Sequence, residues 1–233
     1  MMVVVWVDRF FFTPATTAPM TLVRVAWGIL IAVWALSLLP DVDPFLTTGA
    51  LRYESTLPEG SWNPLDWISW TGAPLAACLL LLGAAVTTAI GYRTRHSAAV
   101  AVVCLIAIQR TNTTIFNSGA LFLRQIGIAV ALSPCGLLWS VDAARMRRSG
   151  TSEAAPLRAP WGLRLLQLEV AVGYLLSASA KLRGSSWRDG GALGMALRID
   201  DLQRFRVPEW IFEQSALLHT LTWATLAFEG GFA

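Results

Sequence analysis

The sequence predicts an all-α, polytopic integral membrane protein, built as a bundle of about six transmembrane or re-entrant helices. Of its 233 residues, 55% are hydrophobic and 14% are charged. Soluble domains carry about 25% charged residues, so this composition excludes an ordinary soluble fold. Several apolar runs also approach the length of about 20 residues that crosses a bilayer as a helix.

The predicted helices follow the apolar runs in chain order. They cover Met20–Leu39, Pro74–Ile90, Ser97–Gln109, Ala120–Trp139, Leu163–Ala180 and a last run from Ser215 to Phe228. Pro40 ends the first helix, because proline cannot continue a helix. The third helix is short and could extend through Thr111–Phe116. The last run is short for a span and lies close to the end of the chain, so a re-entrant helix and a C-terminal truncation both stay open.

The segments outside the helices suggest two further parts. Residues 1–19 are predicted to form an interfacial segment, because Phe10, Phe11 and Phe12 would favour the membrane surface. Residues 20–233 then form the transmembrane domain. Within it, Ser149–Pro160 has the Ser, Gly, Ala and Pro content of a flexible linker before the fifth helix.

The distribution of arginine predicts the orientation in the membrane. The loop Asp41–Gly72 holds one arginine and five acidic residues, so we expect it outside. The arginine-rich segments Gly91–His96 and Ala143–Arg158 should be cytoplasmic, as should the N-terminus. The segment Lys181–Gln214 would then be external, although it holds six basic and five acidic residues. We therefore expect it to be partly embedded in the membrane. A bacterial plasma membrane is the expected location.

Charged side chains at membrane depth are functional candidates, because burying a charge in a bilayer is costly. Arg24, one turn into the first helix, is expected to snorkel to the cytoplasmic surface. Arg110 and Arg124 lie near helix ends, where substrate binding and anchoring are both open. Glu169 is expected to form an ion pair with an arginine of a neighbouring helix, or an interhelical hydrogen bond.

Lys181 is the only lysine, beside 17 arginines. Arginine stays protonated in proteins, whereas lysine in a dry environment can lose its proton and act as a base. A lysine at a helix end also commonly just reaches the interface, and this alternative stays open. Tyr174 lies seven residues earlier on the same helical face. Glu169 lies about 18 Å along the axis and about 120° round it, so it should not be the direct counter-charge.

Taken in order, a set of motifs resembles the HTTM (horizontally transferred transmembrane) domain family. The set comprises Phe10–Phe12, Arg24, Gly91–Arg95, Arg110, Asn117–Gly119, Arg124, Pro134, Ser140–Ala143, Tyr174-x3-Ala178-x2-Lys181-Leu-x-Gly184-x2-Trp187-x2-Gly190, and Glu229. This family includes the membrane half of vitamin K-dependent gamma-glutamyl carboxylase and the bacterial sporulation-delaying toxin maturation proteins.

The resemblance implies a chemistry for Lys181. In the carboxylase, the matching lysine deprotonates vitamin K hydroquinone, which oxygen converts towards its epoxide while a glutamate is carboxylated. A similar role here implies a reduced quinone, vitamin K hydroquinone or menaquinol, with Lys181 as catalytic base. Tyr174, Trp187, Arg110 and Arg124 would bind the substrate. A peptide or secreted-protein substrate would need a separate soluble domain or partner.

Two other functions stay open beside this quinol epoxidase or carboxylase-like activity, so the sequence does not decide whether the protein is an enzyme. One is a non-catalytic accessory role in toxin or peptide maturation or immunity, where Lys181 and Glu169 only hold helices together. The other is transport. No metal site is predicted, because Cys78, Cys104 and Cys135 lack ligand-like spacing and look like small buried hydrophobes. No basic stripe indicates a nucleic-acid partner.

Overall fold

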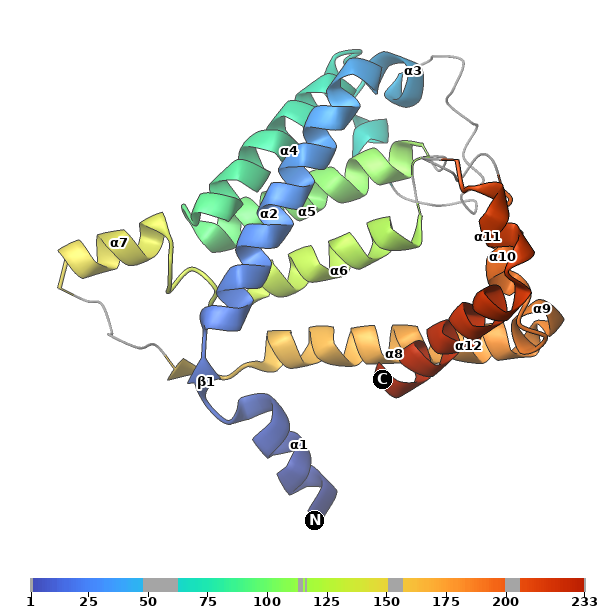
Figure 1. Cartoon of the computed structure of the whole chain (residues 1–233). Coiled ribbons are helices and arrows are strands. Elements are labelled where there is room, and N and C mark those ends of the chain that lie inside the picture. The colour runs from blue at the N-terminus through green and yellow to red at the C-terminus, as the bar shows by residue number, and fades with distance from the viewer. Residues whose placement is uncertain are drawn as a thin grey trace. The chain divides into compact units, whose positions relative to one another are not determined.

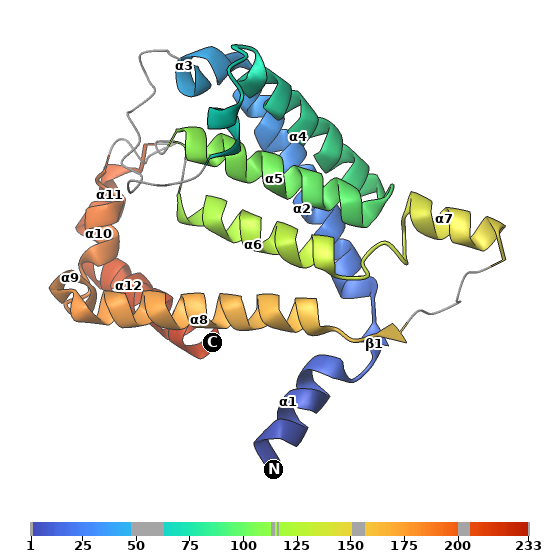
Figure 2. The same ribbon diagram turned by 180° about the vertical axis from the view of Figure 1, so that it is seen from behind.

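The computed structural model describes residues 2–47, 63–112, 115, 117–150, 157–199 and 206–232 (Figures 1 and 2). These residues are mostly helical, with two short strands, which confirms the predicted all-α class. The chain divides into two compact units, Met1–Leu166 and Gln167–Ala233. Each unit is described by itself.

The first unit is a bundle in which α2 packs on α4, α4 on α5, α5 on α6, and α2 on α6. Its elements in chain order are α1 (Met2–Phe12), β1 (Ala15–Thr16), α2 (Ala18–Leu38), η1 (Leu39–Asp41), α3 (Val42–Leu46), η2 (Pro64–Trp67), α4 (Ala73–Ile90), α5 (Thr94–Thr111), α6 (Ser118–Leu132), α7 (Val141–Arg148), β2 (Leu157–Arg158) and the start of α8 (Trp161–Arg183). The two short strands pair antiparallel, Ala15 opposite Arg158, and so join the start of α2 to the start of α8.

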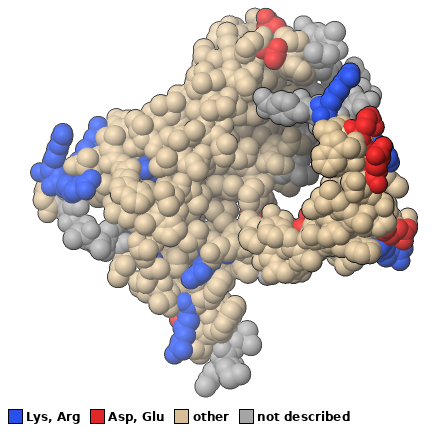
Figure 3. Space-filling model, viewed as in Figure 1, with Lys and Arg blue, Asp and Glu red and all other residues tan. Residues whose placement is uncertain are grey.

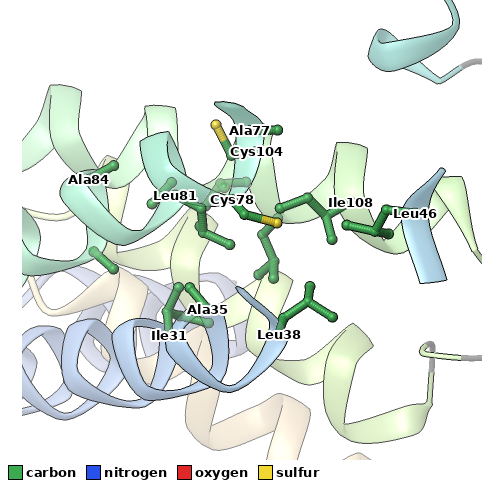
Figure 4. Close-up of a cluster of buried hydrophobic side chains, with 14 of the residues drawn as sticks. Ile31, Ala35, Leu38, Leu46, Ala77, Cys78, Leu81, Ala84, Cys104 and Ile108 are labelled. Atoms are coloured by element: carbon green, nitrogen blue, oxygen red, sulfur yellow. The ribbon is translucent and has the colours of Figure 1, made fainter. Parts of the chain in front are cut away.

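The core of this bundle consists of small and branched apolar side chains (Figure 4). Ile31 and Leu81 are fully buried between α2 and α4, with Ile108 of α5 beside them. Gly28 allows a close helix crossing, since a Cβ there would lie 2.8 Å from the backbone nitrogen of Ala89. The three cysteines are free and buried, as predicted.

Most predicted helix ends are close to those observed, but the end of α6 is not. The sequence predicts a helix from Ala120 to Trp139, whereas α6 ends at Leu132. Ser133 is extended, because the ring of Pro134 disfavours helical backbone in the preceding residue. The predicted helix Ser97–Gln109 is in fact longer, α5, and begins at Thr94.

The second unit contains the rest of α8, followed by α9 (Ser185–Arg188), α10 (Ala192–Ala196), α11 (Glu209–Glu213) and α12 (Ser215–Phe232). The last helix continues four residues past the predicted Phe228. α10 and α9 pack against α12. Gly190, with φ +81°, allows this approach, because a Cβ there would lie 2.9 Å from the ring of His219.

Three described helical stretches are long and apolar enough to cross a membrane, Ala18–Leu46, Ala73–Ile90 and Trp161–Arg183. Gly119–Leu132 is a shorter apolar helix. These apolar helices are typical of a helical membrane protein. Figure 3 shows a broad surface free of charged side chains and a basic cluster over α7, where Arg147 and Arg148 are exposed.

Candidate functional site

Lys181 lies in the last turn of α8 and forms an ion pair with Glu229 of α12. Its Nζ donates to Oε1 of Glu229 across 48 residues of sequence. The side chain of Lys181 is 23% exposed and that of Glu229 is 11% exposed. The lysine is therefore the accessible member of the pair, and the carboxylate is the enclosed one.

The indole of Trp187 lies beside the same amine. After the turn at Gly184, α9 carries Trp187 back towards α8, and Nζ of Lys181 lies 4.7 Å from the ring centroid. At this distance an ammonium group is attracted by the negative face of the ring. Lys181 thus contacts both a carboxylate and an aromatic ring.

Tyr174 extends the site along α8. Its ring contacts Phe228 edge-on at 6.2 Å and Phe232 at 5.0 Å between centroids. Residues seven apart share a helical face, and both Tyr174 and Lys181 contact α12. One seam between α8 and α12 therefore carries an aromatic cluster next to an ion pair.

The second carboxylate oxygen of Glu229, Oε2, is buried and has no hydrogen-bond partner among the described residues. Buried polar atoms are nearly always bonded, and leaving one without a partner costs about 1–3 kcal/mol. Such exceptions call for an explanation in terms of function or a bound molecule.

Glu229 is the residue whose role the sequence did not reveal. It is part of the HTTM-like motif set, but no spacing rule relates it to a lysine 48 residues earlier. The only available signal was a lone acidic residue in an apolar terminal run. Glu169 is not the counter-charge of Lys181, as predicted. Its expected ion pair with an arginine is not found among the described residues.

Arg110 and Arg124, the other two predicted binding residues, lie in the first unit. Nε of Arg124 donates to Oε1 of Gln109, which is 2% exposed, and so links α6 to α5. Nε of Arg110 is buried without a partner in the part of the chain described. The five predicted site residues therefore form two groups, with Lys181, Tyr174 and Trp187 close together in the second unit.

A second polar cluster lies in the first unit, where the α4–α5 turn meets the segment leading into α7. Arg24 is 0% exposed, and its Nη2 donates to the carbonyl oxygen of Trp139 at 2.7 Å. The prediction that Arg24 snorkels to the surface is wrong. The cause is this carbonyl, which the non-helical stretch after α6 carries to the guanidinium.

Asp142 completes this cluster by capping the start of α5. Its Oδ1 accepts from the backbone N–H of Arg93 at 2.9 Å. Its Oδ2 accepts from the N–H of Thr94 at 2.9 Å and from the Thr94 hydroxyl at 3.0 Å. Partial burial acts to raise the pKa of Asp142, but these hydrogen bonds favour the ionised form and hold the pKa below its usual value.

The cluster also holds two strained residues. Arg93 and Trp139 have φ of +45° and +42°, and they are the non-glycine residues with positive φ in the described ranges. Such backbone persists where the surroundings over-determine it. Here the backbone N–H of Arg93 donates to Asp142, and Arg24 donates to the backbone carbonyl of Trp139. These hydrogen bonds hold both strained positions, so the motif residues Arg24 and Asp142 stabilise the fold.

A recess of about 600 Å³ opens in the first unit near the start of α4, lined by residues such as Asp43, Trp70 and Thr111. None of the five predicted site residues lines it. We therefore place the candidate site at Lys181.

Comparison with known families matches the HTTM domain over residues 12–230. The chain belongs to the HTTM domain family. No curated protein and no solved structure matches the chain.

Both polar clusters lie within the matched part of this HTTM domain. Their chemical capacities differ. Arg24 keeps its charge under all ordinary conditions, and Asp142 has both oxygens bonded. Lys181 and Glu229 are joined by one hydrogen bond, and an amine and a carboxyl group can each be neutral or charged. This arrangement can transfer protons.

Proposed function

We propose that this HTTM-domain protein acts on a lipid-borne quinol, with Lys181 as the base that removes a proton from a quinol hydroxyl. The supporting observation is the setting of Lys181, a partly exposed amine in an apolar helix, next to an enclosed carboxylate and an indole ring. A base needs hydrogen-bond reach of the proton it removes, and the side chain of Lys181 is partly exposed to an approaching substrate.

The residues around Lys181 suit an aromatic substrate. Trp187 offers a ring face beside the amine, and Tyr174 stands with Phe228 and Phe232 further along the same seam. Aromatic rings stack or meet edge to face at such separations. Lys181 would orient the hydroxyl, and the rings would hold the flat head group.

Access from the bilayer is consistent with the surface of α8. Leu176 and Leu182 are 64% and 54% exposed on this candidate span. A reduced quinone carried in lipid could therefore approach Lys181 laterally. The quinol supplies the redox chemistry, in which one quinol and one dioxygen give one epoxide and one water.

We also propose a bacterial plasma membrane as the location, with a cytoplasmic N-terminus. The exposed arginines of α7 support the cytoplasmic assignment of that end of the first unit. Carboxylation of a peptide or secreted protein would require a separate soluble domain or partner.

The test is quinol epoxidation by the purified protein in lipid vesicles under oxygen, with product mass as the readout. Vitamin K hydroquinone and menaquinol would each be supplied to wild type, Lys181→Arg and the control Glu169→Gln. We expect epoxide from wild type and from the control, and none from Lys181→Arg. Folded wild type that makes no epoxide from either quinol would refute the proposed activity.

One observation favours a second function, the accessory role. The Lys181–Glu229 ion pair is itself a link between α8 and α12, and such a link could serve only to hold helices together. In that case Lys181→Arg would keep the pair and the function. Retained toxin or peptide maturation in Lys181→Arg cells, without epoxide from purified wild type, would support this alternative.

A further inference from the structure

The following inference rests on the proposed quinol activity. A base must lack a proton before it can accept one, and this requirement raises a difficulty at Lys181. In the structure the protonated amine donates a hydrogen bond to Oε1 of Glu229. An ammonium group has three donors and no acceptor, so it cannot take a proton from a substrate. Some group must therefore remove one proton from Lys181 before or during the reaction.

We infer that Glu229 is this group, a positioning residue that takes up the proton of Lys181 and so makes the amine a competent base. Oε1 of Glu229 already accepts the hydrogen bond along which the proton would move. The transfer needs no rearrangement of either helix.

The surroundings of Glu229 favour this role. Its Oε2 is buried without a partner among the described residues, and the residue as a whole is 9% exposed. An ionised carboxylate in an apolar setting is stabilised only by the hydrogen bonds and charges it meets. Among the described residues Glu229 accepts one such bond, on Oε1, and no described donor reaches Oε2.

The step balances in protons and electrons. The proton shared along Nζ and Oε1 moves to Oε1, which leaves a neutral amine and a neutral carboxylic acid. Nζ then accepts the hydroxyl proton of the quinol, and the electron pair of the broken O–H bond stays on the quinol oxygen. Compared with the starting ion pair, Lys181 is again an ammonium group and Glu229 holds one added proton, so the pair has changed from neutral to singly positive.

No other described group near Lys181 replaces Glu229 as an acceptor. Trp187 offers only a ring face and a donor. The other titratable or charged groups on α8, α9 and α12 are Arg164, Glu169, Tyr174, Arg183, Arg188 and His219. Asp189, directly after α9, is exposed, and its side chain has no contact with Lys181 among the described interactions. The arginines cannot accept a proton, and Glu169 lies about 18 Å away along α8. Tyr174 contacts phenylalanine rings, and His219 lies against Gly190 and Trp223.

The test is the pH profile of epoxide formation with vitamin K hydroquinone in lipid vesicles. Wild type, Glu229→Gln, Glu229→Asp, Lys181→Arg and Glu169→Gln would be compared after each is shown to be folded. Glutamine keeps the shape of glutamate but cannot take the proton. We expect Glu229→Gln to be roughly 100-fold slower than wild type near neutral pH. Its rate should rise about tenfold per pH unit, because bulk water must now deprotonate the amine.

The remaining variants separate this proton role from a merely structural one. Glu229→Asp should retain part of the wild-type rate without that slope, and Glu169→Gln should match wild type. Lys181→Arg should stay inactive at every pH. A Glu229→Gln protein that matches wild type, or is slower by the same factor at every pH, would overturn the inference while leaving the quinol activity intact. Wild type without epoxide would instead refute the proposed function itself.

Discussion

Two buried or half-buried carboxylates, one in each unit of this HTTM domain, are bonded in opposite ways. Asp142 of the first unit accepts three hydrogen bonds, two of them from backbone N–H groups. Glu229 of the second unit accepts one among the described residues, from the side chain of Lys181, and its other oxygen has no described partner. Both oxygens of the first carboxylate are bonded within the fold, whereas we propose that the second carboxylate takes up a proton.

The basic side chains of the two clusters, Arg24 and Lys181, differ in the same sense. Arg24 is completely enclosed and holds a strained backbone carbonyl in place. Lys181 is partly accessible and carries a proton that it can lose. A chain that uses arginine 17 times and lysine once thus has arginine in its buried structural cluster and lysine at its candidate site.

Lys181→Arg should have the largest effect. Arginine preserves the positive charge and the link to Glu229 but cannot act as a base, so epoxide formation should fall by about 100- to 10,000-fold. Product mass after incubation with quinol measures this, with Glu169→Gln as control. Equal activity in Lys181→Arg and wild type would show that Lys181 does not act as a base. It would contradict the proposed chemical difference between the Lys181 cluster and the Arg24 cluster.

Asp142→Ala should break the other cluster without changing the chemistry of Lys181. The substitution leaves the N–H groups of Arg93 and Thr94 without their acceptor, and it should lower the free energy of unfolding by about 3 kcal/mol. Thermal unfolding in detergent measures the loss. Epoxide formation per folded molecule should not change. A variant as stable as wild type would contradict the structural role of Asp142.

Gly91→Ala should destabilise the same cluster through the turn. Gly91 has φ +74°, and an added Cβ would collide with the guanidinium of Arg24 and with Ser140. We expect a loss of about 2–3 kcal/mol in unfolding free energy. Gly150→Ala is the matched control, because φ there is +71° but nothing lies within 4 Å of an added Cβ. It should cost only the left-handed strain of about 1 kcal/mol. Equal losses would show that Arg24 is not packed against the turn.

The pH dependence of stability should show a smaller effect of Asp142. Because its pKa is lowered in the folded protein, the ionised form adds stability above the usual value of 3.8. This contribution is lost as the pH falls through the lower folded pKa. Unfolding measured from about pH 6 down to about pH 2 should therefore show a steeper loss for wild type than for Asp142→Asn. Parallel curves would contradict the assignment.

The sequence predicted local features well and non-local ones poorly. The bounds of α2 and α4 were close to those observed, because hydropathy and Pro40 are local signals. The end of α6 was wrong, since the apolar run continues past Pro134 although the helix does not. The shared face of Tyr174 and Lys181 followed from helical geometry.

What the sequence could not supply was contact between distant segments. The burial of Arg24 depends on a carbonyl 115 residues away, and Glu229 meets Lys181 only because α12 returns along α8. No periodicity or spacing encodes either contact. Lys181 could be selected as a candidate by its uniqueness, whereas its proton partner required the structure.

The most direct test of the Lys181–Glu229 site is the charge exchange Lys181→Glu with Glu229→Lys, assayed for both stability and epoxide formation. The exchanged protein restores an ion pair between α8 and α12 but moves the amine away from Trp187 and into the enclosed position. We predict near wild-type thermal stability and no epoxide. Epoxide formation at the wild-type rate by the exchanged protein would contradict a specific role for Lys181 as base.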